Sequence, residues 1–510
     1  MNSFIDTSQR YKKYYSYLLI IILCIPLLFI NVKNSHDWGD DFAQYIHQAK
    51  NIIEGTPQSS TGYVLNKDYP ILGPPAYPIG FPLLLSPVYY LFGNNIQAFS
   101  IIMSIMLIAA AVLFLKFFKL FFSALSSVFL VLIIIYNPWT LNFKMEIMSD
   151  IPFTLCLYLL IILYHFRDEK RNYLFYFLIG LLGGFLISIR SAGIIFIIAI
   201  SFEFIFCIYQ YQEKRIQYSL LKKLLLQKII MIFSAIFIYS LLNIILFKTP
   251  SMGFLYYTSA LDLKSISYII HDNLTYNFLM LKNFFEFKNI YLQFLSVFTQ
   301  SALLTLTVIG FIKKVIINFD FIDLILILYC ITVLIYPYSD AGFRFIFPIA
   351  PILFYYAVIA IKDFFKTANI FNRKYIPVLI GLIILIQYIG GIEKIIRNHD
   401  RVLFGPQNKY AAEALNYIKT SIPDDAIIEF EKPRAIALYT GKNGFHIKIN
   451  QPITDIKKNF DKVGISYILQ SKRQIDFIGD DSLKKYLSYK NDNIECIWSN
   501  YNFRLYKILK

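Results

Sequence analysis

Charged residues are scarce in this sequence. Asp, Glu, Lys and Arg make up 16% of its 510 residues, whereas a typical soluble domain has about 25%. Hydrophobic residues make up 57%, and apolar runs long enough to cross a bilayer recur along the first four-fifths of the chain. This composition argues against a soluble globular protein and predicts a polytopic membrane protein.

Several functional signatures are also missing. The five cysteines form no Cys-x-x-Cys pair, and four of them lie inside apolar segments, which argues against a disulfide framework or a thiolate metal site. No glycine-rich loop of the phosphate-binding type is present. No internal repeat is visible, which disfavours an inverted-repeat transporter. The first apolar run lacks a small-residue cleavage site, so we expect an uncleaved first span.

Eleven apolar segments predict transmembrane helices, with boundaries good to a few residues. The expected fold class is mainly α: a bundle of about eleven transmembrane helices, followed by a small α/β domain. The segments cover residues 14–31, 97–115, 120–136, 150–166, 173–189, 192–209, 229–247, 291–312, 322–338, 343–361 and 375–391.

The net charge of +16 predicts membrane topology rather than nucleic-acid binding. Basic residues cluster before the first span and after every second span, whereas the alternate loops are poor in Lys and Arg. Cytoplasmic loops of membrane proteins are enriched in Lys and Arg. We therefore expect a multi-pass cell-membrane protein with a cytoplasmic N-terminus, an extracytoplasmic C-terminus and no nucleic-acid partner.

The composition changes near residue 392, where charge rises and long apolar runs stop. The stretch "YAAEALNYIKTSIPDDAIIEF" predicts a helix, a turn and a strand, and "ISYILQ" and "FRLYKILK" predict further strands. We expect a transmembrane domain at 1–391, with a first outer loop at about 32–96, and an extracytoplasmic α/β domain at 392–510. "GFPLLLSPVYYLFG" in that loop is too short to span the membrane and is expected to lie in the interface.

The predicted outer loops collect acids and bases at one membrane face. Ionisable residues that converge at a membrane interface define a candidate site, because leaving them unpaired there is costly. The residues in question are Asp40, Asp41, Lys144, Glu146, Asp150, Arg190 and Arg344.

Four of these residues also have a structural interpretation. Asp40 is placed to cap a helix that begins near Asp41, and Asp150 to cap the fourth span. Arg190 and Arg344 have the positions of interfacial anchors. His36 and His47 lie near carboxylates, which leaves a metal site open. Glu203 falls inside the sixth span and needs a partner that the sequence does not identify.

The ordered set of motifs resembles the GT-C superfamily of polytopic glycosyltransferases. The most similar branch holds the protein O-mannosyltransferases and the lipid A aminoarabinose transferase. In that branch an Asp-x-x-x-Tyr segment follows the first span, as Asp41 and Tyr45 do in "DFAQY". The acid expected after Asp41 is replaced by Phe42, and an extra acid, Asp40, precedes it. The other similar stretches, in order, are "YPIGFPLLLSP", "MSDIPF", "SIRSAG", "AGFRFIFPIAP" and "KPRAIALYTGK".

This resemblance implies an enzyme that transfers a sugar from a polyprenyl-phosphate donor to a lipid, glycan or protein acceptor at the outer face. Asp41 or Asp40 is then the general base. Arg190, Arg344 and Lys144 are the candidates for binding the donor phosphate, and Glu146, Asp150 and Tyr45 for orienting the acceptor. No cofactor is expected, although a divalent metal is left open.

Two other classes compete with this interpretation. A transporter or flippase of lipid-linked sugars predicts ionisable residues deep in several spans and helices broken near the middle of the membrane. A non-catalytic scaffold with an outer domain requires no convergence of acids and arginines. The sequence instead places nearly all of its polar chemistry at one face, with Glu203 as the exception.

Overall fold

The computed structural model of the chain describes ten stretches of it. Three of the basic stretches used for the topology prediction, at 10–13, 167–171 and 362–374, lie wholly or partly outside them. The described residues are 14–167, 172–247, 265–285, 293–338, 342–367, 376–448, 450–473, 475, 482–489 and 493–509.

Helices dominate the first four-fifths of the chain, and each of the eleven predicted spans overlaps an apolar helix. Within the described residues, six helices are long and apolar enough to cross a membrane, and six apolar helices are shorter. The prediction of a mainly helical multi-pass membrane protein is therefore confirmed. The helices are Tyr14–Leu28, α4 (Ile96–Lys119), α5 (Ala124–Ile135), α7 (Asp150–His165), α8 (Tyr173–Ile189), α9 (Ile195–Gln212), α10 (Tyr218–Leu242), α13 (Gln293–Ile317), α14 (Phe321–Leu334), α15 (Ala350–Thr367) and α16 (Ile376–Arg397).

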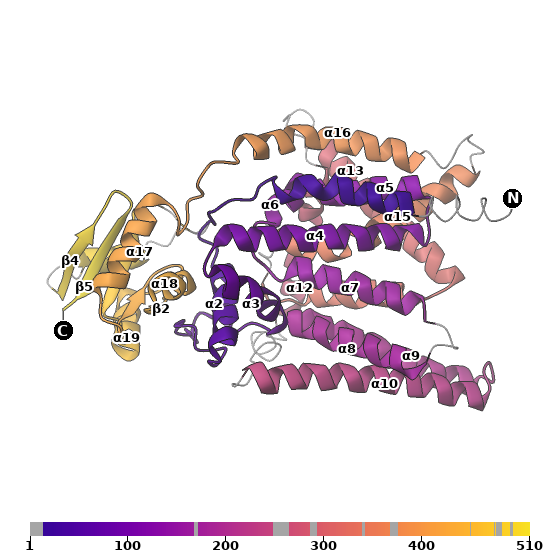
Figure 1. The fold of residues 1–510 in the computed structure, drawn as a ribbon, viewed down its shortest axis with the longest axis horizontal. Helices are drawn as coiled ribbons and strands as arrows, with labels where there is room; N and C mark the ends of the chain where they lie inside the picture. Colours follow the sequence, from indigo (N-terminus) through magenta and orange to yellow (C-terminus); the bar gives the residue numbers. More distant parts are fainter. Residues whose placement is uncertain are drawn as a thin grey trace.

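The long helices run side by side as a bundle (Figure 1). Helices α8 and α10 approach closely because α8 presents glycines: a Cβ added at Gly180 or Gly184 would collide with the α10 backbone. Small residues at such contacts let helices pack tightly within a bilayer, where no hydrophobic effect drives them together. Helix α12 (Ile266–Leu281) accompanies these helices, as do several short helical segments: η1 (Ile25–Leu28), α6 (Pro138–Phe143), η3 (Ser191–Ile194), η4 (Asn243–Phe247), η5 (Lys282–Phe284), η7 (Gly342–Phe345) and η8 (Phe347–Ile349).

Glu203 in α9 has the partners that the sequence did not identify. Its carboxylate forms an ion pair with Lys228 of α10 and accepts a hydrogen bond from the Tyr164 hydroxyl of α7. Arg167 lies 3.6 Å away. A carboxylate paired in this way avoids the cost of an isolated charge within the membrane. The position of Glu203 inside a span is therefore explained by its contacts, which link α7, α9 and α10.

The first loop folds into α2 (Asp41–Glu54), η2 (Pro70–Leu72) and α3 (Gly80–Phe92). Helix α2 has one apolar face that buries Phe42, Tyr45 and Ile46, and it ends at Gly55 in a left-handed conformation. Figure 1 shows α2 and α3 between the long helices and the C-terminal part of the chain, residues 409–509, which we call the sheet-bearing part because it holds a β-sheet. This position brings the start of α2 to the junction of the two parts.

The C-terminal part holds a five-stranded sheet of order β2-β1-β3-β5-β4, in which β1 is parallel to β2 and β3, and β5 is antiparallel to β3 and β4. The predicted helix and the three predicted strands match α17, β1, β3 and β5. The predicted division near residue 392 falls inside α16. The elements are α17 (Lys409–Ser421), β1 (Ile427–Glu429), α18 (Pro433–Thr440), β2 (Asn443–Phe445), α19 (Ile453–Val463), β3 (Tyr467–Ser471), α20 (Ser482–Tyr489), β4 (Ile494–Ser499) and β5 (Phe503–Ile508).

The first loop is bonded to the edge of this sheet. Tyr63 forms a parallel bridge with Gly444 of β2, and the Val64 N–H donates to the Gly444 carbonyl at 2.9 Å. The Asn66 amide donates to the His446 carbonyl at 2.9 Å. Backbone bonds at an open sheet edge also satisfy groups that would otherwise be unpaired. The loop therefore ties the sheet-bearing part to the region around α2.

Candidate active site

The Asp41 carboxylate, at the first residue of α2, receives three donors from distant parts of the chain. Its Oδ1 accepts hydrogen bonds from the Tyr77 hydroxyl and from Arg434 Nη1 at 3.1 Å. Its Oδ2 lies 3.3 Å from Arg344 Nη1. Acids are favoured in the first turn of a helix, where the macrodipole is positive. Asp41 is thus held between two guanidinium groups.

A second carboxylate continues this arrangement. Asp150, the first residue of α7, is fully buried; it forms an ion pair with Arg190, and its Oδ2 lies 3.4 Å from Arg344 Nε. Arg344 therefore bridges Asp41 and Asp150. The charges alternate along six residues from five separate segments, three acids and three arginines: Asp40, Arg434, Asp41, Arg344, Asp150 and Arg190.

The neighbouring arginines keep Asp41 ionised. Burial alone would raise the pKa of this carboxyl, but Arg344, Arg434 and the Tyr77 hydroxyl outweigh burial and hold the pKa below its usual value. At neutral pH, Asp41 is therefore a carboxylate and acts as an acceptor only. A cationic or protic group that enters the site would compete with the two arginines for it.

A cavity of about 470 Å³ opens beside this network. Its polar wall includes Asp41, Tyr45, Tyr77, Arg190 and Arg344. Volumes of this size hold small molecules or the head of a larger one. The remaining wall is largely apolar and comes from η3, α9, α14 and the segments around them: Ile71, Ile189, Ile194, Ile195, Ile198, Leu328, Ile331, Val333 and Ile335.

Asp40 and Asp41 differ in what they contact. Asp40 occupies the N-cap position of α2 but makes no side-chain cap there. Its Oδ1 instead accepts from the backbone N–H groups of Arg434 (3.1 Å) and Ala435 (3.2 Å), at the start of α18. It does not line the cavity. Burial raises the pKa of Asp40 to about 6. The predicted cap of α2 is therefore not observed, and Asp40 instead accepts hydrogen bonds from the first turn of α18, almost 400 residues away.

The structure also brings Tyr45 and Asp150 to the site. The Tyr45 hydroxyl donates to Ser149 Oγ at 3.1 Å, and both residues line the cavity. Asp150 lies within the first turn of α7 with its carboxylate directed to the two arginines, and Ser149, the N-cap residue, makes no side-chain cap. The N-cap role considered for Asp150 is thus not observed.

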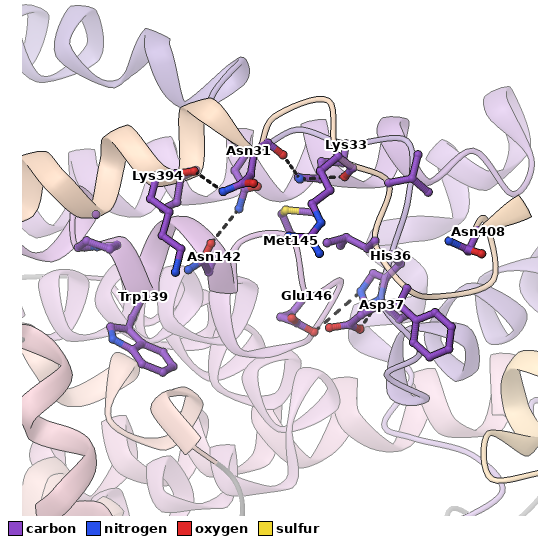
Figure 2. A pocket seen from close by; sticks show the side chains of 18 of the residues that line it. Asn31, Lys33, His36, Asp37, Trp139, Asn142, Met145, Glu146, Lys394 and Asn408 are labelled. Atoms are coloured by element: carbon purple, nitrogen blue, oxygen red, sulfur yellow. Dashed lines mark hydrogen bonds and ion pairs between the residues drawn. The ribbon is translucent and has the colours of Figure 1, made fainter. Parts of the chain in front are cut away.

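Lys144 and Glu146 lie outside this cavity. Lys144 is fully buried, and its Nζ donates to Ser104 Oγ at 2.9 Å; burial lowers its pKa to about 7. The placement of Lys144 does not support the predicted contact with a donor phosphate shared with Arg190 and Arg344. Glu146 lines a second cavity of about 730 Å³ together with His36 and Asp37 (Figure 2).

Arg434 and Tyr77 are site residues to which sequence reasoning assigned no role, and Arg434 is the more distant of the two in sequence. Its side chain is 2% exposed; besides Asp41 it contacts the Tyr77 hydroxyl at 3.0 Å and the carbonyls of Leu72 and Pro74. A guanidinium with five fixed donors suits such a set of acceptors. The stretch "KPRAIALYTGK" contains it, but nothing in that stretch indicates a partner in the first loop.

The sequence matches no protein-family model and no curated protein. Its structure, however, has the fold of solved GT-C proteins. ArnT from Cupriavidus metallidurans, bound to undecaprenyl phosphate, superposes with a TM-score of 0.56 at 10% identity over 96% of this chain and 97% of that one. The oligosaccharyltransferase AglB from Archaeoglobus fulgidus, in complex with an inhibitory peptide and a dolichol-phosphate, gives 0.58 at 14% identity over 90% and 70%. The predicted GT-C resemblance is confirmed as a likeness of fold.

Proposed function

We propose that this chain is a membrane glycosyltransferase that moves a sugar from a polyprenyl-phosphate donor to an acceptor at the extracytoplasmic face. The observation that carries the proposal is the wall of the 470 Å³ cavity, where a carboxylate and two arginines adjoin isoleucine- and leucine-lined helices. Arginine suits phosphate, and an apolar groove suits an isoprenoid chain. The solved neighbours of the same fold hold undecaprenyl phosphate and dolichol-phosphate.

Arg190 and Arg344 are the proposed ligands of the donor phosphate. In the free site they are paired with Asp150 and Asp41, so an incoming phosphate would take over part of their hydrogen bonding. As Arg344 turns toward the phosphate, Asp41 would lose one of its partners, and its carboxylate would become a stronger base than it is in the free site. Binding of the donor would in this way prepare the carboxylate for the next step.

The reaction is a displacement at the anomeric carbon. An acceptor hydroxyl or amine attacks that carbon while Asp41 takes its proton, and the bond from carbon to the phosphate oxygen breaks. The departing polyprenyl phosphate keeps the electron pair, and Arg190 and Arg344 stabilise its charge. Attack opposite to the phosphate inverts the anomeric centre. Tyr45 and Asp150 would orient the groups around the reacting carbon.

Mass spectrometry of detergent-solubilised membranes tests this function. Membranes from cells that lack the protein contain both unused donor and unused acceptor, so added wild-type protein should convert lipid-linked sugar into free polyprenyl phosphate. Solubilisation removes the two sides of the membrane, and a flippase would then change no molecule chemically. Absence of conversion by well-folded wild-type protein would therefore contradict the transferase and favour the transporter.

A further inference from the structure

The two ring nitrogens of His36 differ: Nδ1 is hydrogen-bonded to Asp37, and Nε2 has no hydrogen-bond partner among the described residues. The side chain is 3% exposed, and its ring stacks on Phe42 with 3.9 Å between centroids. Nδ1 lies 3.0 Å from the Asp37 carbonyl and 3.0 Å from Asp37 Oδ1. Nε2 is buried and has no hydrogen-bond partner among the described residues. A hydrogen bond at Nδ1 fixes the tautomer in which Nε2 offers a lone pair.

Glu146 lies opposite that nitrogen. It follows α6, and its Oε2 is 3.9 Å from His36 Nε2. One ligand atom from each of His36, Asp37 and Glu146 lies within 4.8 Å of the others. Figure 2 shows the three side chains gathered at the edge of the second cavity, with the Glu146 carboxylate directed toward the His36 ring.

The chemistry of this group is that of a cation site. Two carboxylates so close together repel each other, and the repulsion is relieved by a shared cation. One imidazole nitrogen with carboxylate oxygens is a donor set for zinc or manganese, while magnesium and calcium prefer oxygen alone. We propose that His36, Asp37 and Glu146 bind one divalent cation of the zinc or manganese type, with its other coordination positions open to the second cavity.

This site is distinct from the network around Asp41. None of the three residues lines the smaller cavity, and none forms an ion pair with Arg190, Arg344 or Arg434. The inference also does not depend on the proposed sugar transfer, because metal binding is measured without any substrate. Phe42, which follows Asp41 in α2 and stacks on the His36 ring, connects the two sites, and the charges of Arg344 and Asp41 also influence the pKa of Glu146.

The test is a metal titration of the purified full-length chain in detergent after removal of metal with a chelator. Zn²⁺ and Mn²⁺ are each added alone and followed by calorimetry, and bound metal is counted by elemental mass spectrometry. Wild type should bind one cation per chain. Glu146→Gln, which keeps the side-chain shape, and His36→Gln should each weaken binding by about tenfold or more.

The controls are Glu54→Gln and His399→Gln, which change exposed residues of the same types outside the group. Both should bind the cation as wild type does. Thermal midpoints of all variants establish that each is folded, and Glu146→Gln is the decisive variant because its side chain is partly exposed. Wild type that binds neither cation at submillimolar concentration, or Glu146→Gln that binds as tightly as wild type, would overturn the site.

Discussion

At the scale of single residues, the adjacent acids Asp40 and Asp41 show how one step along the backbone changes a carboxylate's role. Asp41 lines the cavity between two arginines, whereas Asp40 does not line it: its carboxylate accepts from the backbone of α18 and lies 3.8 Å from Arg434 Nη1. The sequence left both acids as candidates for the base. The geometry favours Asp41, because only its carboxylate borders a space that a substrate can enter.

Asp40 should make stability fall as the pH rises. Its folded-state pKa of about 6 lies above its ordinary value of 3.8, so the folded state holds the proton more tightly. The stability this contributes is complete below about pH 4 and is lost as the pH rises through 6, by at most about 3 kcal/mol. Asp40→Asn keeps the acceptor oxygen but cannot titrate.

We therefore expect the thermal midpoint of Asp40→Asn, relative to wild type, to increase between pH 4 and pH 7. Midpoints of both proteins in the same detergent across this range provide the measurement. A constant difference between the two proteins would show that Asp40 has the same pKa in the folded and unfolded chain.

Arg434 should be needed for turnover, even though it comes from the sheet-bearing part. Arg434→Lys keeps the charge but cannot reach Asp41, the Tyr77 hydroxyl and two carbonyls at once. The loss of a hydrogen bond to a charged group corresponds to roughly 1.5–3 kcal/mol, so turnover should fall about 10- to 100-fold. Lys432→Arg, two residues earlier, is the control. Unchanged turnover in folded Arg434→Lys would remove Arg434 from the site.

At the scale of elements, the sequence predicts the long helices well and the site poorly. An apolar run of about 20 residues is sufficient to predict a span, and each of the eleven such runs overlaps an apolar helix in the described residues. Helix α18 has eight residues, and its Arg434 is 393 positions from Asp41. Such a pairing depends on tertiary packing, and no local pattern encodes it.

The sequence also does not predict where the Lys144 side chain lies, for the same reason. Lys144 and Glu146 are two positions apart in one loop, and the sequence therefore places both at the interface. The turn after α6 directs Lys144 inward to Ser104 and Glu146 toward the second cavity. A sequence pattern locates a loop, but it does not determine which side chains of that loop turn into the protein.

The loop element around Gly73 should be sensitive to a single methyl group. Gly73 has a φ of +85°, and a Cβ there would lie 2.9 Å from Tyr77 Oη and 3.0 Å from Arg434 Nη2. Gly93→Ala is a matched control, because Gly93 also has positive φ (+59°) but a Cβ there meets nothing within 4 Å. Both alanines carry backbone strain, and only Gly73→Ala crowds the site.

We expect Gly73→Ala to lower turnover by about tenfold relative to Gly93→Ala, with similar thermal midpoints. The comparison uses the polyprenyl phosphate release assay and thermal unfolding in parallel. Equal turnover in the two variants would mean that the Tyr77 and Arg434 positions are not critical for the reaction.

At the scale of the whole molecule, the sheet-bearing part and the helices form one site, since Arg434 reaches Asp41 and the first loop pairs with β2. The proposed reaction requires this assembly to face outward. The positive-inside pattern predicts that side for residues 392–510. The side of the membrane on which residues 392–510 lie therefore needs a direct measurement.

Cys496 provides a native probe of sidedness, because among the cysteines it is the exposed one and it lies in β4. A membrane-impermeant maleimide should label wild type in intact cells and should not label Cys496→Ser. Glu213→Cys in the Cys496→Ser background, at the far end of α9, should be labelled only after permeabilisation. The reverse pattern would invert the topology and place the site in the cytoplasm.

The central claim is that Asp41 acts in transfer of a lipid-linked sugar. It is tested most directly by mass spectrometry of surface glycoconjugates and polyprenyl-phosphate sugars from cells with wild type, Asp41→Asn, Asp40→Asn or no protein. Loss of a general base commonly reduces the rate by about 10² to 10⁴. We predict that one sugar disappears from a glycoconjugate in the null strain and in Asp41→Asn, that its lipid-linked form accumulates there, and that Asp40→Asn resembles wild type. A glycoconjugate profile in folded Asp41→Asn that matches wild type would contradict the account.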